Sequence, residues 1–287
     1  MSTLRISLPI YLVVLTILLI NASNTSAHTT IAQKNSPVDF ASRTEIEGSS
    51  SVFNDISIGH GCSAANSPVT QPVIALSVVF PNSATAISTI DDTIVDLAEH
   101  IEGNAIMSPK PVQDNRIFQR ISVKRGEVPT FEHHGTRSDD ARAFHYNKGY
   151  LQTDLSGLLP FQASFPQFKA TSCATSLKIN LAIANYCTRS IRDADRADIW
   201  IGTLTSKFDD EAVVSVGFWP SLVVKRDLEN NPLPLSCNDE VQVVVTPSNE
   251  DIDRYLPING FWPGAVLPGT SAPSLPGSTP GPNSVPR

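Results

Sequence analysis

Short apolar runs of strand length, bounded by proline and other turn residues, constrain the fold of this chain more than any other feature. Residues 73–80 lie between Pro72 and Pro81 and are apolar at every position but one, which is typical of a strand buried on both faces. Further runs, at residues 117–123, 177–183, 212–218 and 241–245, are β-branched or alternate with period two, and turn residues separate them. The pattern predicts an all-β fold, an immunoglobulin- or cupredoxin-like β-sandwich with one short helix and long loops.

One segment has helical periodicity instead. We expect a short amphipathic helix that starts near a cap formed by Thr89 and Asp92 and stops at Gly103. His100 falls on the polar side of this helix and is expected to be solvated. Four residues at helical spacing form the apolar face: Ile94, Leu97, Ala98 and Ile101.

The first 27 residues have the pattern of a secretory signal peptide. One basic residue, Arg5, precedes the apolar run at residues 6–20, and a short polar region ends at Ala27. The apolar run is shorter than the ~20 residues that span a bilayer comfortably. We therefore expect cleavage after Ala27 and a secreted or periplasmic protein, which would contact a membrane only through the leader if it stayed uncleaved.

The remainder of the chain divides by composition into one large domain and a tail. Residues 28–263 carry all of the strand-like runs and are expected to form a single β-sandwich domain. Within this domain, residues 125–150 are polar and predict a long loop or an insertion. Residues 264–287 are rich in Pro, Gly and Ser and hold too little apolar surface to fold, which predicts a disordered tail.

Charge and motifs exclude several classes of function. The net charge is −7 and the basic residues are scattered, whereas nucleic-acid binding needs a basic face, so no nucleic-acid partner is expected. The sequence contains no Gly-x-Ser-x-Gly elbow, no phosphate-binding loop and no His-Glu-x-x-His motif. Hydrolases and nucleotide-dependent enzymes are therefore disfavoured, and we expect a protein that is not an enzyme.

The chain has four cysteines, which in an exported protein predict two disulfides. Three pairings are open. A bridge between Cys173 and Cys187 would clasp the two ends of the strand-like run at residues 177–183, and Cys62 and Cys237 would then join distant parts. A cysteine metal site is disfavoured because no Cys-x-x-Cys pair occurs.

Cleavage after Ala27 would make His28 the first residue of the mature chain. A terminal histidine offers its free amine and its imidazole Nδ1 to one metal ion as a six-membered chelate. Cu(II) stands at the top of the stability order for nitrogen ligands and suits this pair. The alternative is that the terminal histidine is an accident of cleavage.

Two blocks of the chain follow, in order, the pattern of a known family and resemble the YcnI-like exported copper-binding proteins, in which a mature N-terminal His begins the first strand. The first block comprises residues 28–31 (His-Thr-Thr-Ile), the Gly-Ser-containing residues 47–58, residues 60–62 (His-Gly-Cys) and the run at 72–81. The second block comprises residues 198–202 (Asp-Ile-Trp-Ile-Gly) and 208–212 (Phe-Asp-Asp-Glu-Ala).

The resemblance implies a copper site with a single histidine. Its ligands would be the amine and imidazole of His28 together with a carboxylate oxygen, and Trp200 would wall the site without binding the metal. Without the family, Trp200 would be interpreted as a core aromatic. A glutamate that some members carry is Ser51 here, so Glu47 and Glu45 are the nearest carboxylate candidates. More remote candidates follow Phe208: Asp209, Asp210 and Glu211.

His60 is a second candidate ligand. It stands two residues before Cys62 and could turn toward the metal. The alternative is a hydrogen bond to loop backbone, which a histidine in a His-Gly-Cys turn forms equally well.

These features predict an exported protein that holds one Cu(II) ion through His28, for copper storage, delivery or protection. The implied partners are the copper ion and a copper chaperone or transporter. Two alternatives stay open. One is a secreted structural or adhesion β-domain without a metal, and the other is a copper monooxygenase-like enzyme, which requires a second histidine ligand.

Overall fold

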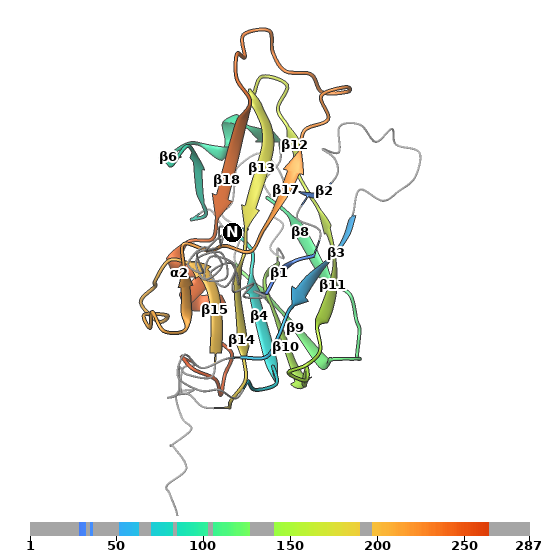
Figure 1. The fold of residues 1–287 in the computed structure, drawn as a ribbon. Helices are drawn as coiled ribbons and strands as arrows, with labels where there is room; N and C mark the ends of the chain where they lie inside the picture. Colours follow the sequence, from blue (N-terminus) through green and yellow to red (C-terminus); the bar gives the residue numbers. More distant parts are fainter. Residues whose placement is uncertain are drawn as a thin grey trace, which may run out of the picture.

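The computed structural model describes residues 29–32, 35–36, 52–62, 70–82, 85–102, 106–126, 141–189 and 197–263. This part of the chain is an all-β sandwich with one short α-helix, as the sequence predicts (Figure 1). The signal peptide predicted at residues 1–27 and the tail predicted at residues 264–287 lie outside it. Within these ranges, no helix combines the length and the apolar character that crossing a membrane requires.

The strands of this described part form three larger sheets and a two-stranded one. The first sheet has the order β1 (Thr30–Ile31), β3 (Val52–Ile58), β11 (Gly157–Ser164), β8 (Ser108–Pro111). The second has the order β16 (Val214–Val216), β15 (Ala197–Gly202), β14 (Ala182–Tyr186), β4 (Ala75–Val79), β10 (Ala141–Gly149), β9 (Phe118–Arg125). The third has the order β2 (Asn35–Ser36), β17 (Ser221–Lys225), β13 (Ala174–Asn180), β18 (Val241–Thr246), β5 (Ile87–Ile90), β6 (Thr93–Ile94). The small sheet pairs β12 (Gln167–Phe168) with β7 (Ile101–Glu102).

Two apolar cores lie on the two faces of the second sheet. The inner core joins this sheet to the first and third sheets, and the outer core packs under the α-helix, α2 (Asn249–Tyr255), and the chain that follows it. β4 contributes to both, because Leu76 and Val78 belong to the inner core while Ala75 and Val79 belong to the outer one. All five residues of β4 are buried, which confirms the strand buried on both faces that residues 73–80 predict.

The third sheet continues into the second through one extended segment. β13 ends at Asn180, and β14 begins at Ala182 after a single residue, Leu181. In Figure 1, β13 therefore lies in the upper half of the molecule and β14 in the lower half. An extended chain rises about 3.3 Å per residue, so the two ends of this segment are far apart.

Both disulfides form, but not in the pairing considered for Cys173 and Cys187. Cys62 bonds to Cys187, and Cys173 bonds to Cys237. Cys173 and Cys187 stand at opposite ends of the extended β13–β14 segment, well beyond the ~7 Å between Cα atoms that a disulfide can bridge. The prediction of two disulfides is confirmed, and the structure supplies the connectivity.

The helix predicted over residues 94–101 is wrong. Asp91 and Asp92 have positive φ angles of 47° and 63° and form the two-residue turn of the β5–β6 hairpin. Ile94 lies in β6 and is 78% exposed, so the apolar spacing produces no buried helix face. Only a 3-10 turn, η3 (Leu97–Glu99), follows.

The polar loop predicted over residues 125–150 is also wrong in its second half. Residues 141–149 form β10, which pairs with β4 and β9 in the second sheet. Phe144 and Tyr146 alternate into the inner core, and this period-two signal was masked by the polar residues between them. Residues 127–140 lie outside the described ranges.

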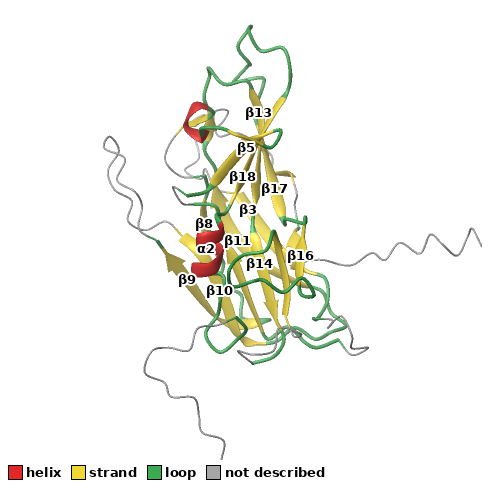
Figure 2. Ribbon diagram, turned by 90° about the vertical axis from the view of Figure 1, so that its left-hand side faces the viewer, coloured by secondary structure: helices red, strands yellow, loops and turns green. Residues whose placement is uncertain are grey.

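The α-helix of the described chain, α2, begins after Ser248. The Oγ of Ser248 accepts a hydrogen bond of 3.2 Å from the backbone N–H of Asp251 and caps the helix. Figure 2 shows α2 in red beside β10. The helix is too short for its periodicity to stand out in the sequence, although the Ser-x-x-Asp cap was present there.

Candidate functional site

The first described residue, Thr29, is fixed between the two sheets of the sandwich. Its side chain is buried, and its Oγ1 accepts a hydrogen bond of 2.8 Å from Nδ2 of Asn185 in β14. β1 follows at once and pairs with β3, with Thr30 opposite Ser57. The point at which residue 28 joins the folded chain is therefore held against the second sheet.

Asn185 and two further side chains, Asp198 and Trp200, share the inner face of the second sheet on this side. Asn185 stands opposite Asp198, and Ile183 stands opposite Trp200. Opposite residues of an antiparallel pair share a face and lie about 5 Å apart, and residues two apart on a strand return to the same face. Trp200 is part of the inner core, so Asp198 and Asn185 also face inward. We call Thr29, Asn185, Asp198 and Trp200 the N-terminal cluster.

The N-terminal cluster contains a hydrogen-bond acceptor without a donor in the described part of the chain, the side-chain oxygen of Asn185. The residue is fully buried, and its Oδ1 has no hydrogen-bond partner among the described residues. A buried amide oxygen without a donor is costly. The N-terminal cluster therefore combines a half-buried carboxylate, an acceptor oxygen without a partner among the described residues, and an indole, all on the face of the second sheet that contacts Thr29 through Asn185.

Other residues predicted for the metal site fall in different places. His28, Glu45 and Glu47 lie outside the described ranges. The remote carboxylates at residues 209–211 lie between Phe208 and Val213, which both belong to the outer core, so they are on the opposite face of the second sheet from Trp200. Among the residues that the structure describes, no group of three or more His, Cys, Asp or Glu side chains is placed to hold a metal ion.

Asp198 is the carboxylate that sequence reasoning missed. It stands two residues before Trp200 in a strand-like run, so the period-two rule places both on one face. The signal points to a site only through the pairing of β15 with β14, which places Asp198 opposite Asn185.

His60 and His100 form their hydrogen bonds away from the N-terminal cluster. His60 is half-buried, and its Nδ1 is within hydrogen-bond reach of the backbone oxygen of Gly61, which favours the loop role over metal ligation. His100, expected to be solvated, has its Nδ1 3.0 Å from Oγ of Ser172. Burial lowers the pKa of His100.

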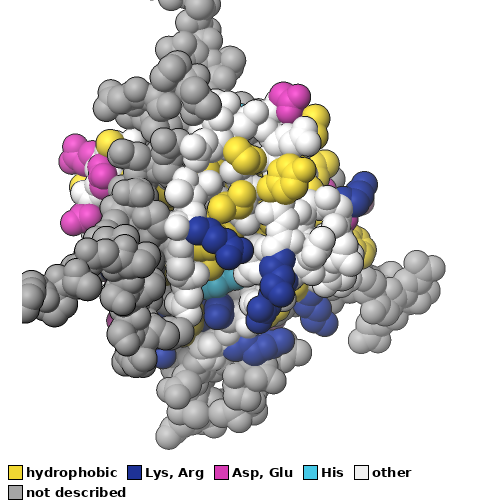
Figure 3. Space-filling model, turned by 90° about the horizontal axis from the view of Figure 1, so that it is seen from below, with side chains coloured by type: hydrophobic (Ala, Val, Ile, Leu, Met, Phe, Trp, Pro, Cys, Tyr) yellow, Lys and Arg dark blue, Asp and Glu magenta, His cyan; other side chains and the backbone are white. Residues whose placement is uncertain are grey.

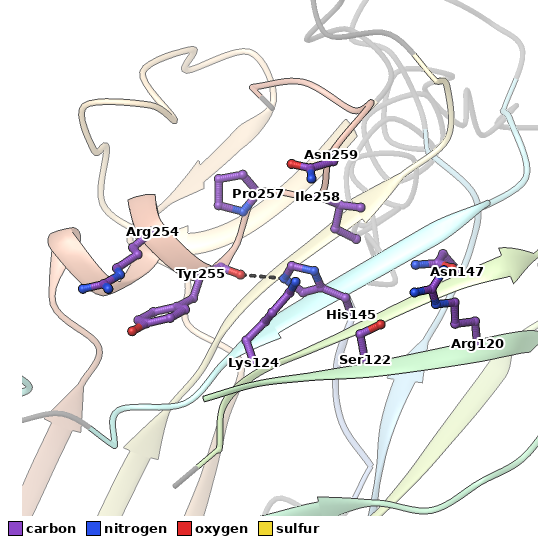
Figure 4. A pocket seen from close by; sticks show the side chains of 10 residues that line it. All are labelled: Arg120, Ser122, Lys124, His145, Asn147, Arg254, Tyr255, Pro257, Ile258 and Asn259. Carbon is purple, nitrogen blue, oxygen red and sulfur yellow. Dashed lines mark hydrogen bonds between the residues drawn. The ribbon is translucent and has the colours of Figure 1, made fainter. Parts of the chain in front are cut away.

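A second candidate site is a pocket of about 510 Å³ on the outer face of the second sheet, between β9, β10 and α2 (Figure 4). Arg120 and Lys124 reach it from β9, and Arg254 reaches it from α2. No Asp or Glu occurs among the described residues that line it. Figure 3, which views the molecule from below, shows Lys and Arg side chains gathered around a histidine. We call this cavity the basic pocket.

Strand alternation builds the floor of the basic pocket. Arg120, Ser122 and Lys124 point outward from β9, while the residues between them pack against the inner core. Ser122 pairs with His145 and Arg120 with Asn147 in β10, so these side chains share the outer face.

The rim of the basic pocket is fixed by hydrogen bonds to the last carbonyls of α2. Ser77 Oγ and Tyr186 OH donate to the backbone oxygen of Leu256 at 2.6 Å and 3.0 Å. His145 Nε2 donates to the backbone oxygen of Tyr255 at 2.7 Å. These carbonyls have no partner within the helix, so donors from the sheet satisfy them and hold the helix in place.

His145 is neutral in the folded protein. Burial, with a smaller contribution from the positive charge of Lys124, lowers its pKa to about 4, although the bond to the Tyr255 carbonyl raises it. A neutral ring that donates through Nε2 keeps Nδ1 as an acceptor. The basic pocket therefore contains a hydrogen-bond acceptor among its cations.

The depressed pKa of His145 predicts a loss of stability in acid. The unfolded chain binds the proton near pH 6.5 and the folded chain only near pH 4. Stability is therefore complete above about pH 6.5 and falls by roughly 3 kcal/mol as the pH drops to about 4. Urea unfolding at several pH values, compared with His145→Gln, which retains a donor for the Tyr255 carbonyl but does not titrate, measures this term. Equal pH slopes for the two proteins would contradict it.

Comparison with known proteins gives no family for this chain. No protein-family model matches it, and the search of curated proteins finds no significant match.

Proposed function

We propose that this protein is an exported copper-binding protein that holds one Cu(II) ion at its mature N-terminus, for copper storage, delivery or protection, with a copper chaperone or transporter as partner. The observation that carries the proposal is the position of Thr29. Its side chain is anchored to Asn185 inside the sandwich, so a chain cleaved after Ala27 would begin one residue away from the N-terminal cluster.

His28 would supply the nitrogen ligands. Consecutive Cα atoms are about 3.8 Å apart, so the amine and imidazole of His28 could reach the cluster in a conformation that turns them toward the inner face of the second sheet. The amine and Nδ1 form the chelate that suits Cu(II) in tetragonal geometry. Both groups must lose protons to bind, with reference pKa values near ~8 and ~6.5, so copper affinity should fall below neutrality.

The N-terminal cluster would supply the rest of the site. Asp198 offers the carboxylate oxygen for which Glu47 was the candidate, and the Oδ1 of Asn185 is an acceptor without a partner among the described residues. Trp200 carries only an N–H donor on its indole, so it would wall the site and exclude water rather than bind the metal. A single histidine, a carboxylate and a tryptophan are the set that the YcnI-like resemblance implies.

The test begins with protein that the cell has exported and processed. Intact mass establishes whether His28 is the first residue. Copper is then titrated by calorimetry and by electron paramagnetic resonance. We expect one tight site with nitrogen hyperfine structure, which disappears in His28→Ala and in a protein with one extra residue before His28.

The carboxylate assignment has its own matched pair of variants. Asp198→Asn should weaken copper binding at least about tenfold, as loss of a group that orients or binds a metal does. Asp209→Asn, a similar change on the opposite face of the sheet, should leave affinity unchanged. Circular dichroism checks that both variants fold. A tight site that survives His28→Ala would overturn the proposed function, and equal affinities for the two Asp variants would remove Asp198 from the site.

A further inference from the structure

The basic pocket concentrates positive charge in a protein that is negative as a whole. The chain has a net charge of −7, yet three cations and no carboxylate occur among the described residues that line this cavity. Cations that line one cavity without a carboxylate to balance them give it a positive potential that attracts anions. Solubility does not require such a cluster, because the remaining surface is acidic. The arrangement therefore fits an anionic ligand.

The spacing of the cations selects a ligand with separated charges. Arg120 and Lys124 are four residues apart on β9, which places their Cα atoms about 13 Å apart. Arg254 approaches from α2 on the other side of the cavity (Figure 4). A compact oxyanion such as phosphate would reach only part of this set. The pocket volume of about 510 Å³ also lies within the range typical of sites for larger organic ligands.

The polar lining selects a ligand that carries hydroxyl groups. Ser122, Asn147 and Asn259 line the pocket beside the cations. His145, held neutral with its proton on Nε2, offers Nδ1 to an O–H donor. At the edge, the guanidinium of Arg254 lies over the ring of Tyr255, 5.3 Å from its centroid, which holds this cation at the pocket.

We propose that the basic pocket binds a short acidic saccharide of about two uronic acid residues, separately from the copper site. The carboxylates pair with Arg120, Lys124 and Arg254, where arginine can form two parallel hydrogen bonds to one carboxylate. The hydroxyl groups bond to the polar side chains of the floor. The outer face of the second sheet would then hold a glycan while the inner face holds the metal.

The test uses calorimetric titration of the full exported chain, freed of metal by dialysis against a chelator. The test ligand is digalacturonate, and its dimethyl ester has the same shape without the charges. We expect one binding site for digalacturonate, affinity that falls as salt rises, and no measurable binding of the ester. Citrate, a compact polyanion, should bind at least tenfold more weakly.

Variants of exposed cations locate the ligand. Arg120, Lys124 and Arg254 are all exposed, so glutamine substitutions should leave folding intact. Arg120→Gln with Lys124→Gln should weaken digalacturonate binding at least about tenfold, because bonds to charged groups are lost. Lys225→Gln, an exposed cation in the third sheet, is the matched control and should change nothing. No binding of digalacturonate, equal binding of the ester or citrate, or insensitivity to the double variant would each overturn the proposal. None of these results bears on copper at His28.

Discussion

Replacing Cys62 and Cys187 together with alanine is expected to lower the free energy of unfolding by about 4 kcal/mol. The disulfide joins residues separated by 125 positions, so breaking it releases the unfolded chain from a long closed loop. It also ties the two sheets of the sandwich together, because Cys62 follows β3 and Cys187 follows β14. Both cysteines are buried. Equilibrium unfolding in urea compares the variant with the wild type.

The second disulfide provides the matched control. Cys173→Ala with Cys237→Ala opens a loop with a separation of 64, and loop entropy alone makes this loss smaller by about 0.6 kcal/mol. It also acts on the third sheet, away from the sandwich contact. An unchanged urea midpoint in Cys62→Ala/Cys187→Ala would contradict the role assigned to the bond between the sheets.

Local patterns predicted much of the fold where a strand carries its own signal. Residues 73–80 predicted a strand buried on both faces because nearly every side chain is apolar, and β4 confirms this prediction. Residues 94–101 misled because spacing alone does not show which side is buried. This segment is a hairpin instead of a helix, with a tight turn at Asp91-Asp92 and an exposed Ile94. Both features depend on the β5–β6 pairing.

Contacts between distant segments could not be predicted from the sequence. The disulfide connectivity depends on β13 running straight into β14, which separates Cys173 from Cys187. Arg120 and Arg254 line the same basic pocket although 134 positions separate them in the sequence. In the sequence alone, these cations are scattered charges. Trp200 could be singled out through the family resemblance, whereas Asp198 became a candidate only through the strand pairing, which places it opposite Asn185, the partner of Thr29.

Arg226→Met is expected to lower the free energy of unfolding by about 3 kcal/mol, because buried backbone oxygens lose their hydrogen bonds to a charged donor. The side chain is 5% exposed. Its Nη1 donates to the backbone oxygens of Ser172 and Ala174 at 2.6 Å and 3.3 Å. Its Nε and Nη2 donate to the backbone oxygens of Asn231 and Pro232 at 2.7 Å and 3.0 Å. One guanidinium therefore joins the start of β13 to the loop that leads to Cys237.

Methionine fills a similar volume but donates no hydrogen bond, so it leaves these carbonyls without the guanidinium donors that Arg226 supplies, in a place that water reaches poorly. Arg226→Lys should recover only part of the loss, because one ammonium group cannot reach both segments as the planar guanidinium does. Lys225→Met, at the exposed neighbouring position, should change the free energy of unfolding by less than about 0.5 kcal/mol. Urea unfolding ranks the three variants, and faster hydrogen exchange in the loop before Cys237 would locate the damage. If Arg226→Met were as stable as Lys225→Met, the third sheet would be held by its disulfide and strand pairing alone.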